Sequence, residues 1–284
     1  MDLKTLYDTP PWEWPRNAGK RFQETLLNPG AKESDRLIAA ELAGSLVVMN
    51  AELAGSLLAI IRGSGEPEGL RAKAAIALGP VLEQAYTDEF DDPEDVPITQ
   101  PMFLKIQKSL QILYLDNTIP KEVRRRILEA SVRAPENWHR EAIGAAYSSG
   151  DKELVLTAVF SMRWVRGFDD QILEALKSAD PLIHYEAVKS AGTWGPDKAW
   201  SHVVDLVNDS STPKHLLIAA IVAVGCIRPS EAREILTEFA GSDDEDIAEA
   251  ADETILIAEG TLEYEEEDDE DEEDDKEPGT AWVN

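Results

Sequence analysis

Residues 67–79 read PEGLRAKAAIALG, and this stretch decides the fold. Taking Leu70 as position zero, small or aliphatic residues stand at +4, +5, +7 and +8. These residues are Ala74, Ala75, Ala77 and Leu78. In an α-helix the four offsets lie on one face. The stretch therefore predicts a short helix that buries a narrow face of small side chains against a neighbouring helix.

The same template recurs along the chain with a common phase. Its zero positions, called anchors below, are Ile38, Leu70, Val123, Leu154, Ile183, Leu216 and Ile247. Most anchors are about 31 residues apart, and chance amphipathic helices do not keep such a register. The fit is poorest at Ile247, because Asp252 takes a position that should be buried. A second amphipathic segment precedes each anchor helix, at roughly 18–28, 50–62, 101–116, 137–148, 168–178, 197–208 and 230–240.

The repeating unit resembles the second helix of a short HEAT repeat, the type also known from phycobilisome lyases. The resemblance covers about residues 18–259. It implies an all-α fold, a right-handed α-solenoid or superhelix of about seven antiparallel two-helix HEAT-like repeats, with the second helices on the concave side. Arg71, Arg124 and His184 each follow an anchor, where the resemblance implies a structural ladder that bonds to neighbouring turns. As a whole the chain is similar to bacterial HEAT repeat domain-containing proteins.

Three segments differ from the repeats. Residues 1–17 are rich in proline and tryptophan and are predicted to cap the first repeat, since a terminal repeat must cover an open apolar face. The one enlarged interval contains the acids and prolines of 87–100, which predict an inserted surface loop. Residues 260–284 are predicted to be a disordered acidic tail, because 265–275 are eleven consecutive acids that repel one another.

The charge of the chain bears on its partners. The formal net charge is −29 over 284 residues, of which residues 261–284 carry −12 and residues 1–260 carry −17. Binding to nucleic acid or to anionic lipid depends on Lys and Arg neutralising phosphates. The composition therefore disfavours a nucleic-acid or membrane partner. We expect no signal peptide and no membrane span, because no stretch approaches about 18 uncharged apolar residues.

Cysteine usage bears on the compartment. The single cysteine, Cys226, permits neither an intramolecular disulfide nor a cysteine-based zinc site. This fits a reducing compartment, and we expect a cytoplasmic protein.

Catalytic and metal motifs were tested against the same sequence. The histidines His139, His184, His202 and His215 show no His-x-x-x-His spacing, and a zinc site needs three or four converging ligands. Deoxyhypusine hydroxylases resemble this architecture and hold two irons with His-Glu pairs, but the chain contains no His-Glu dipeptide. We assign no catalytic, cofactor or metal residue and expect no enzyme. A site assembled across repeats would leave no local spacing, and that alternative stays open.

Two other families share the repeat type. HEAT-like alkylpurine DNA glycosylases bind DNA in a basic groove lined with tryptophan, and Trp164 with its neighbouring arginines is similar. The acidic charge of the chain argues against that function. Bilin lyases resemble the repeat as well, but no residue here indicates a pigment.

Positions +2, +3, +6 and +10 from each anchor lie outside the buried face and are predicted to line the concave surface. In the central repeats, these positions and the nearby helix ends gather cationic and aromatic side chains. The candidate partner-binding strip consists of Arg125, Arg126, Arg133, Arg163, Trp164, Arg166, Tyr185, Lys189 and Trp194. On an acidic body such a strip fits an acidic or aromatic-bearing peptide. The alternative is structural, with the tryptophans filling gaps between helices.

The end of the chain suggests a second element. The acidic run is followed by an apolar end that contains Trp282. One hypothesis is that the tail competes for the strip or offers Trp282 as a docking anchor. The alternative is a solvated tail without specific contacts, and no ordered calcium site is expected because the spacing of a calcium loop is missing.

Taken together, these features predict a protein–protein interaction scaffold or adaptor that uses the concave surface and is modulated by its tail. The expected partner is a protein or an acidic peptide, including the chain's own tail, and no cofactor is expected. The alternative is an accessory or maturation factor, a lyase-like helper for an enzyme or a cofactor protein. Nucleic-acid binding is a third class. The HEAT resemblance indicates the architecture of the chain but does not identify its partner.

Overall fold

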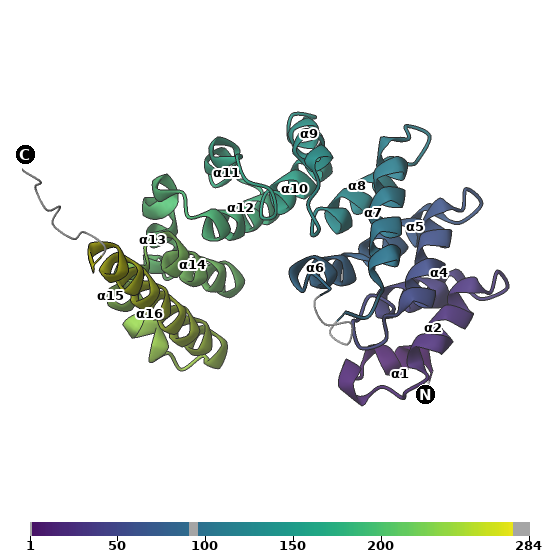
Figure 1. Ribbon diagram of the computed structural model, residues 1–284, viewed down its shortest axis with the longest axis horizontal. Coiled ribbons are helices and arrows are strands. Elements are labelled where there is room, and N and C mark those ends of the chain that lie inside the picture. The colour runs from purple at the N-terminus through teal and green to yellow at the C-terminus, as the bar shows by residue number, and fades with distance from the viewer. Residues whose placement is uncertain (1, 91–95, 275–284) are drawn as a thin grey trace, which may run out of the picture. The chain divides into compact units, whose positions relative to one another are not determined.

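The computed structural model describes the backbone of residues 2–90 and 96–274, and the side chains as far as residue 260. Within those ranges the chain forms helices, turns and connections, with no β-strand. The chain divides into two compact units, Met1–Val165 and Arg166–Asn284. In both units successive antiparallel helix pairs pack side by side (Figure 1), which confirms the predicted all-α solenoid class.

The first unit holds four of these pairs and three additional elements. The pairs are α2 (Ala18–Leu27) with α3 (Glu33–Leu42), α4 (Ala51–Arg62) with α5 (Glu68–Ile76), α7 (Gln100–Leu115) with α8 (Lys121–Ser131), and α9 (Asn137–Tyr147) with α10 (Lys152–Ser161). The additional elements are α1 (Leu3–Tyr7), the 3-10 helix η1 (Pro11–Glu13) and α6 (Gly79–Thr87).

The second unit holds three pairs. They are α11 (Asp169–Ala175) with α12 (Pro181–Trp194), α13 (Trp200–Asn208) with α14 (Lys214–Ile227), and α15 (Pro229–Ala240) with α16 (Glu245–Asp274). A 3-10 helix, η2 (Asp197–Ala199), leads into α13. Every segment that the sequence predicted as a first helix corresponds to one of the observed first helices, from α2 to α15.

The buried face of the second helices follows the sequence register. In α5, α8, α10, α12 and α14, or in the turn that follows each, all four residues at +4, +5, +7 and +8 from the anchor are buried. Alanine is the commonest residue at these positions, and the others are valine, serine, leucine, isoleucine and methionine. The small side chains let neighbouring helices approach closely. Hydrophobic burial along this narrow face therefore supports the stacking of each pair on the next.

The first repeat has a different register from the predicted one. The buried residues of α3 and its C-terminal turn are Ala39, Ala40, Leu42 and Ala43. Leu46, which should be buried if Ile38 were the anchor, is 40% exposed. The anchor is therefore Asp35, three residues earlier. This register places Arg36 directly after the anchor, as Arg71 and Arg124 are in their repeats.

Three arginines tie second helices to first helices. The Nε of Arg36 donates to the carbonyl of Leu26 (3.0 Å), and that of Arg71 donates to the carbonyl of Ile61 (2.9 Å). Arg124 donates in the same way to the carbonyl of Tyr114, at 2.7 Å. Each bond satisfies an orphan carbonyl in the last turn of the preceding helix. His184, the other expected member of this ladder, contacts His202 instead.

The N-terminal segment lies against the first helix pair. Leu6 is fully buried, and α1 packs on α3. The indole Nε1 of Trp14 donates to the carbonyls of Leu6 (3.0 Å) and Thr9 (2.8 Å), and its ring meets Phe22 edge-on at 5.3 Å. Trp12 is 78% exposed. The apolar contacts that cover the first pair therefore come from Leu6 and Trp14.

The enlarged interval contains more than the predicted surface loop. Helix α6 occupies its first part, and Val96 and Ile98, near the end of the connection, are buried. Phe90 also packs edge-on against Phe103, with ring centroids 5.5 Å apart. Apolar side chains therefore hold both ends of the connection between α6 and α7. Residues 91–95 lie outside the described part of the chain.

The C-terminal helix extends further than the sequence suggests. Helix α16 continues to Asp274, so its backbone enters the acidic run that the sequence assigned to the tail. Glutamate is a good helix former, and this propensity opposes the repulsion between neighbouring acids. Trp282 lies outside the described residues. In the part of the chain that is described, no helix is long and apolar enough to cross a membrane.

Candidate functional site

A pocket lies in the first unit between the pair α7–α8 and the pair α9–α10. Its volume is about 160 Å³. An engineered apolar cavity of about 150 Å³ admits a benzene molecule, so the pocket suits one apolar side chain. Its lining residues are Tyr114, Lys121, Arg124, Arg125, Leu128, Ala145, Ala146 and Leu154.

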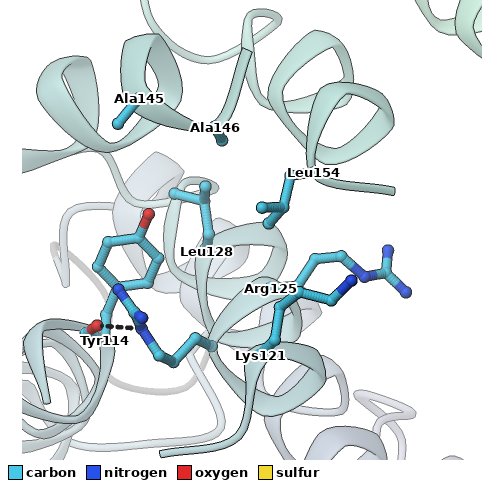
Figure 2. A pocket seen from close by; sticks show the side chains of 8 residues that line it. Tyr114, Lys121, Arg125, Leu128, Ala145, Ala146 and Leu154 are labelled. Atoms are coloured by element: carbon cyan, nitrogen blue, oxygen red, sulfur yellow. Dashed lines mark hydrogen bonds between the residues drawn. The ribbon is translucent and has the colours of Figure 1, made fainter. Parts of the chain in front are cut away.

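The floor and far wall of the pocket are apolar. Leu128 and Ala146 are buried, Leu154 is half-buried, and Ala145 is exposed at the rim. Figure 2 shows the ring of Tyr114 and the side chains of Leu128 and Leu154 facing the same space, with Ala145 and Ala146 on the other side. Helices α7, α8, α9 and α10 supply this surface. The pocket therefore forms only where one repeat stacks on the next.

Arg124 places a guanidinium beside the pocket that forms no ion pair among the described residues. Its Nε is fixed on the carbonyl of Tyr114, and its guanidinium lies 5.3 Å from the centroid of the Tyr114 ring. Its two terminal nitrogens have no hydrogen-bond partner in the described part of the chain, and Arg124 forms no ion pair there. The carboxylate of Asp116 accepts hydrogen bonds from the hydroxyl and the amide of Thr118, and these bonds are the main cause of its lowered pKa. The charge of Arg124 lowers the pKa of Asp116 to a smaller extent. The terminal nitrogens are thus available to an outside acceptor.

Tyr114 adds a hydroxyl at the apolar end. Its ring packs against the ring of Trp138 with centroids 5.1 Å apart, which fixes its orientation. Burial raises the pKa of Tyr114, with a smaller opposing effect of Arg124. The phenol therefore stays protonated and can donate a hydrogen bond. Among the described residues it has no hydrogen-bond partner.

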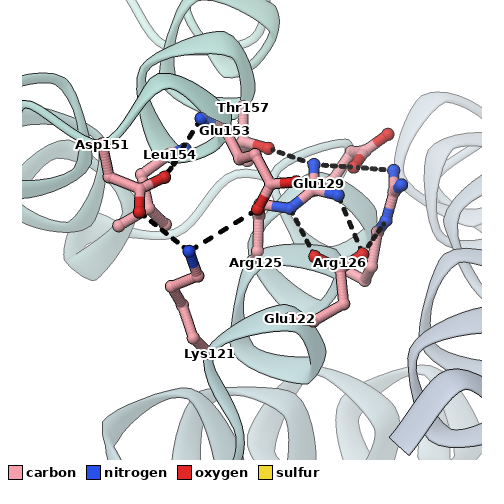
Figure 3. Close-up of polar contacts among 9 residues, drawn as sticks. All are labelled: Lys121, Glu122, Arg125, Arg126, Glu129, Asp151, Glu153, Leu154 and Thr157. Carbon is pink, nitrogen blue, oxygen red and sulfur yellow. Dashed lines mark hydrogen bonds and ion pairs between the residues drawn. The ribbon is translucent and has the colours of Figure 1, made fainter.

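The two arginines that follow are tied up by acids on their own helix (Figure 3). Arg125 is buried and donates to both carboxylate oxygens of Glu122 at 2.8 Å and to the hydroxyl of Thr157 at 3.1 Å. Arg126 pairs with Glu122 at 2.9 Å and with Glu129 at 2.7 Å. Burial alone would raise the pKa of Glu122, but the hydrogen bonds from both arginines hold it below its ordinary value. Arg125 and Arg126 therefore stabilise α8 and its contact with α10.

Lys121 closes the other side of the pocket. Its ammonium lies 2.8 Å from Asp151 and 3.5 Å from Glu153, at the start of α10 (Figure 3). Asp151 is also the N-cap of α10 and accepts from the amides of Glu153 and Leu154. The cation is more than half exposed and paired with two acids, so it serves chiefly to join the two repeats.

Other residues of the predicted strip meet in the first unit. The guanidinium groups of Arg133 and Arg163 lie 5.5 Å and 4.5 Å from the centroid of the Trp164 ring. Phe160 lies beside Trp164, with ring centroids 4.8 Å apart. Arg133 is also paired with Glu83 at 2.8 Å. The sequence prediction identified the two arginines and the tryptophan but missed Phe160 and Glu83.

The remaining strip residues lie in the second unit and form two separate contacts there. The Nζ of Lys189 is 5.3 Å from the ring centroid of Tyr185. The guanidinium of Arg166 is 4.8 Å from that of Trp194. These are cation–π pairs of ordinary geometry. Trp282, the expected tail anchor, is not among the described residues.

The sequence contained a signal for Arg124 that the strip prediction did not use. Arg125 and Arg126 each have an acid three and four residues away along α8, where helical side chains meet. Arg124 has Pro120, Lys121, Ile127 and Leu128 at those positions. The absence of an acid at helical spacing distinguishes it from its neighbours. Tyr114, Ala145 and Leu154 leave no local pattern, because the pocket forms only when two repeats stack.

The described side chains include no group of three or more His, Cys, Asp and Glu residues that could hold a metal ion. His139 is buried, with Nδ1 accepting from the amide of Glu136 (2.8 Å) and Nε2 lying 3.0 Å from the hydroxyl of Ser131. Burial lowers the pKa of His139 to about 4. It is therefore a neutral structural side chain.

Comparison with known proteins identifies the repeat. A family model described as HEAT repeats matches residues 170–255, which span α11 to the middle of α16. No curated protein matches the chain.

Three solved structures have a similar backbone fold. YibA of Escherichia coli is 12% identical with a TM-score of 0.48, and the match covers 89% of this chain and 92% of that one. Human deoxyhypusine hydroxylase in complex with glycerol is 15% identical with a TM-score of 0.38, covering 85% and 96%. An engineered protein is 16% identical with a TM-score of 0.35, covering 87% and 98%. Likenesses at this level say nothing about activity or ligands.

Proposed function

We propose that this chain, whose residues 170–255 are HEAT repeats, is a protein-binding scaffold that holds a short acidic segment of a partner at the pocket between α7–α8 and α9–α10. HEAT repeats generally present surfaces to other proteins. One observation carries the proposal: the terminal nitrogens of Arg124 have no partner among the described residues, and they stand beside an apolar pocket. A carboxylate next to an apolar side chain matches both features.

Each part of such a ligand has a counterpart. The guanidinium fork suits a carboxylate, which it binds with two parallel charge-assisted hydrogen bonds. The hydroxyl of Tyr114 can donate a hydrogen bond to a polar group of the ligand near the apolar end of the pocket. An aromatic or branched aliphatic side chain fills the space over Leu128 and Leu154. Fixing Arg124 by its Nε lowers the entropy lost on binding, because the side chain is already ordered.

The charge of the chain favours a peptide over nucleic acid. Tracking a phosphate backbone takes several unpaired cations, whereas Lys121, Arg125 and Arg126 are all paired with acids. A single free guanidinium suits one or two carboxylates. The proposed function is therefore non-enzymatic, and binding depends weakly on salt compared with a nucleic-acid partner.

Three predictions from the sequence remain beside this one. The contacts of Arg133 and Arg163 with Trp164 offer the first unit a further surface for an acidic or aromatic segment. The tail with Trp282 is predicted to act as a competitor for such surfaces. The accessory-factor alternative predicts that purified protein carries a cofactor or binds a cofactor protein.

Methyl NMR on the full chain tests the proposal with defined probes. The probe is a capped tripeptide with phenylalanine between two aspartates, and its controls replace the aspartates by lysines or the phenylalanine by glycine. We expect saturable shifts of the methyl groups of Leu128, Ala145 and Leu154 with the first peptide, and much smaller shifts with either control. Equal shifts with the lysine peptide would refute the role of Arg124, and no shifts with any peptide would refute the site.

A further inference from the structure

Helix α7 has an apolar side that faces solvent. Leu104, Ile112 and Leu115 are 55%, 56% and 62% exposed. Their spacing of eight and three residues aligns them along about 16 Å of the helix, opposite the buried side that contains Phe103 and Leu110. These three residues are called the α7 stripe below. The helix thus packs on the core with one side and leaves a second apolar side uncovered.

The α7 stripe is bordered by cations. Lys105 and Lys108 are exposed on the same side of α7, and Arg62 at the end of α4 donates to the hydroxyl of Ser109. Lys108 donates to the side chain of Gln111 at 3.1 Å. Helix α7 contains no acid, and none of the three cations forms an ion pair in the described part of the chain. The stripe therefore carries uncompensated positive charge on an acidic protein.

Helix α4 borders the same side of α7 with small residues. The two helices are in contact, with Gly55 beside Met102 and Arg62 beside Ser109. A Cβ on Gly55 would lie 3.6 Å from the terminal methyl of Met102. Ala59, which lies between these two contacts along α4, is exposed. An alanine at this position leaves room for another helix to approach α7 from that side.

We propose that the α7 stripe docks an amphipathic helix of a partner protein, with acidic residues on both sides of its apolar face. Such helices bind through apolar side chains one and two turns apart, and three turns of α7 present matching positions. The acids of the partner would meet Lys105, Lys108 and Arg62 in charge-assisted hydrogen bonds. None of these residues lines the pocket beside Arg124, so this surface is independent of the proposed peptide site.

The charge distribution favours a partner helix over an anionic membrane. A cationic helix with an apolar face also suits the surface of anionic lipid. A bilayer, however, extends along the whole side of the protein and meets its acidic residues, which give residues 1–260 a net charge of −17. A single helix meets only the cations that border the stripe, because charges beyond about 8 Å are largely screened at physiological salt.

Methyl NMR on the full chain tests this docking surface. The probe is a capped peptide of about 18 residues, long enough to be helical, with leucines along one face and glutamates on both sides of them. One control peptide replaces the glutamates by lysines, and the other replaces the leucines by alanines. We expect the glutamate peptide to shift the methyl groups of Leu104, Ile112 and Leu115 saturably, and either control peptide to bind at least about ten-fold more weakly.

Two variants and a matched control locate the contact. Lys108→Glu should weaken binding of the glutamate peptide at least about ten-fold and strengthen binding of the lysine peptide, because it reverses a charge at the interface. Ile112→Ser should weaken binding of the glutamate peptide at least about five-fold. Leu182→Ser is the control, since Leu182 is also 56% exposed but belongs to the second unit, and it should bind like the wild type. Circular dichroism checks that each variant is folded.

Three results would overturn the proposal. The first is equal affinity for the glutamate and lysine peptides, and the second is unchanged binding in both Lys108→Glu and Ile112→Ser. The third is binding of the wild type, but not of Lys108→Glu, to phosphatidylglycerol vesicles, because the surface would then belong to a membrane. Shifts confined to the methyl groups of Leu128 and Leu154 would support the pocket and contradict docking at α7.

Discussion

Arg124 and Tyr114 contact each other twice, through a 2.7 Å hydrogen bond from Nε to the backbone carbonyl and through a guanidinium that lies 5.3 Å from the ring centroid. The first contact belongs to the ladder that joins each second helix to its first helix. The second places the guanidinium beside a ring that lines the pocket. A residue that stabilises the repeat thus also carries the charge on which the proposed peptide site depends.

The first prediction concerns Arg36, the ladder arginine that also binds a carboxylate. Arg36 donates twice to the carbonyl of Leu26 and binds both carboxylate oxygens of Glu66, at 2.7 Å and 2.9 Å. Arg36→Met leaves a carbonyl and a carboxylate without their donor, so we expect the free energy of unfolding to fall by about 2–3 kcal/mol. Urea denaturation of the two proteins at neutral pH measures this difference.

The same variant should change the pH dependence. The hydrogen bonds from Arg36 lower the pKa of Glu66 below its ordinary 4.5. The stability that this pair contributes is present above about pH 4.5 and is lost as the pH falls through the lowered pKa. The stability difference between wild type and Arg36→Met should therefore shrink as the pH falls below 4.5. A difference that stays constant down to pH 3 would contradict the role of Glu66.

The second prediction concerns His139. Its pKa is about 4 in the folded protein, against an ordinary value of 6.5, so the unfolded chain takes up a proton at a higher pH than the folded chain does. His139 alone should cost the wild type about 3 kcal/mol of stability as the pH falls from 6.5 to 4. His139→Gln removes the His139 part of the slope and leaves the part that His184 and His202 contribute, because burial lowers their pKa values too. Its stability at pH 7 is lower because the bonds to Glu136 and Ser131 change. Gly144→Ala, which changes no titratable group and meets nothing within 4 Å, is the control and should keep the wild-type slope.

Much of the fold could be predicted from the sequence because small side chains at fixed offsets determine where helices touch. Alanines and serines at +4, +5, +7 and +8 are buried in five of the second helices. The first repeat was assigned to Ile38 because hydrophobicity alone defined the anchor. Arg36, which marks the register by its bond to Leu26, was the better guide.

The site was harder to predict, for a physical reason. The position of a residue on the exposed face of a helix does not show whether its charge is paired. Arg125, for example, was predicted to be exposed but is buried against Glu122 and Thr157. Counting acids at helical spacing separates Arg124 from Arg125 and Arg126. The apolar half of the pocket, with Ala145 from α9, depends on how one pair stacks on the next.

The third prediction tests the packing of the second unit. A Cβ on Gly225 would overlap the methyl group of Thr254, whose hydroxyl is held by the carbonyl of Ala250 at 2.6 Å. Gly225→Ala must therefore push α14 away from α16, and we expect a loss of about 1–3 kcal/mol in the free energy of unfolding. Gly144→Ala is the matched control, since nothing lies within 4 Å of the added methyl. It should gain about 0.5–1 kcal/mol, and a loss in both variants would contradict the packing argument.

The central claim is that the pocket beside Arg124 binds an apolar side chain flanked by carboxylates. The most direct measurement is the affinity of the capped aspartate–phenylalanine–aspartate peptide for the full chain and for Ala145→Leu, which fills the pocket from its exposed rim. Gly144→Ala, one residue away and outside the lining, is the control. The account predicts at least about ten-fold weaker binding to Ala145→Leu and unchanged binding to Gly144→Ala. Equal affinity of the wild type and Ala145→Leu would contradict it.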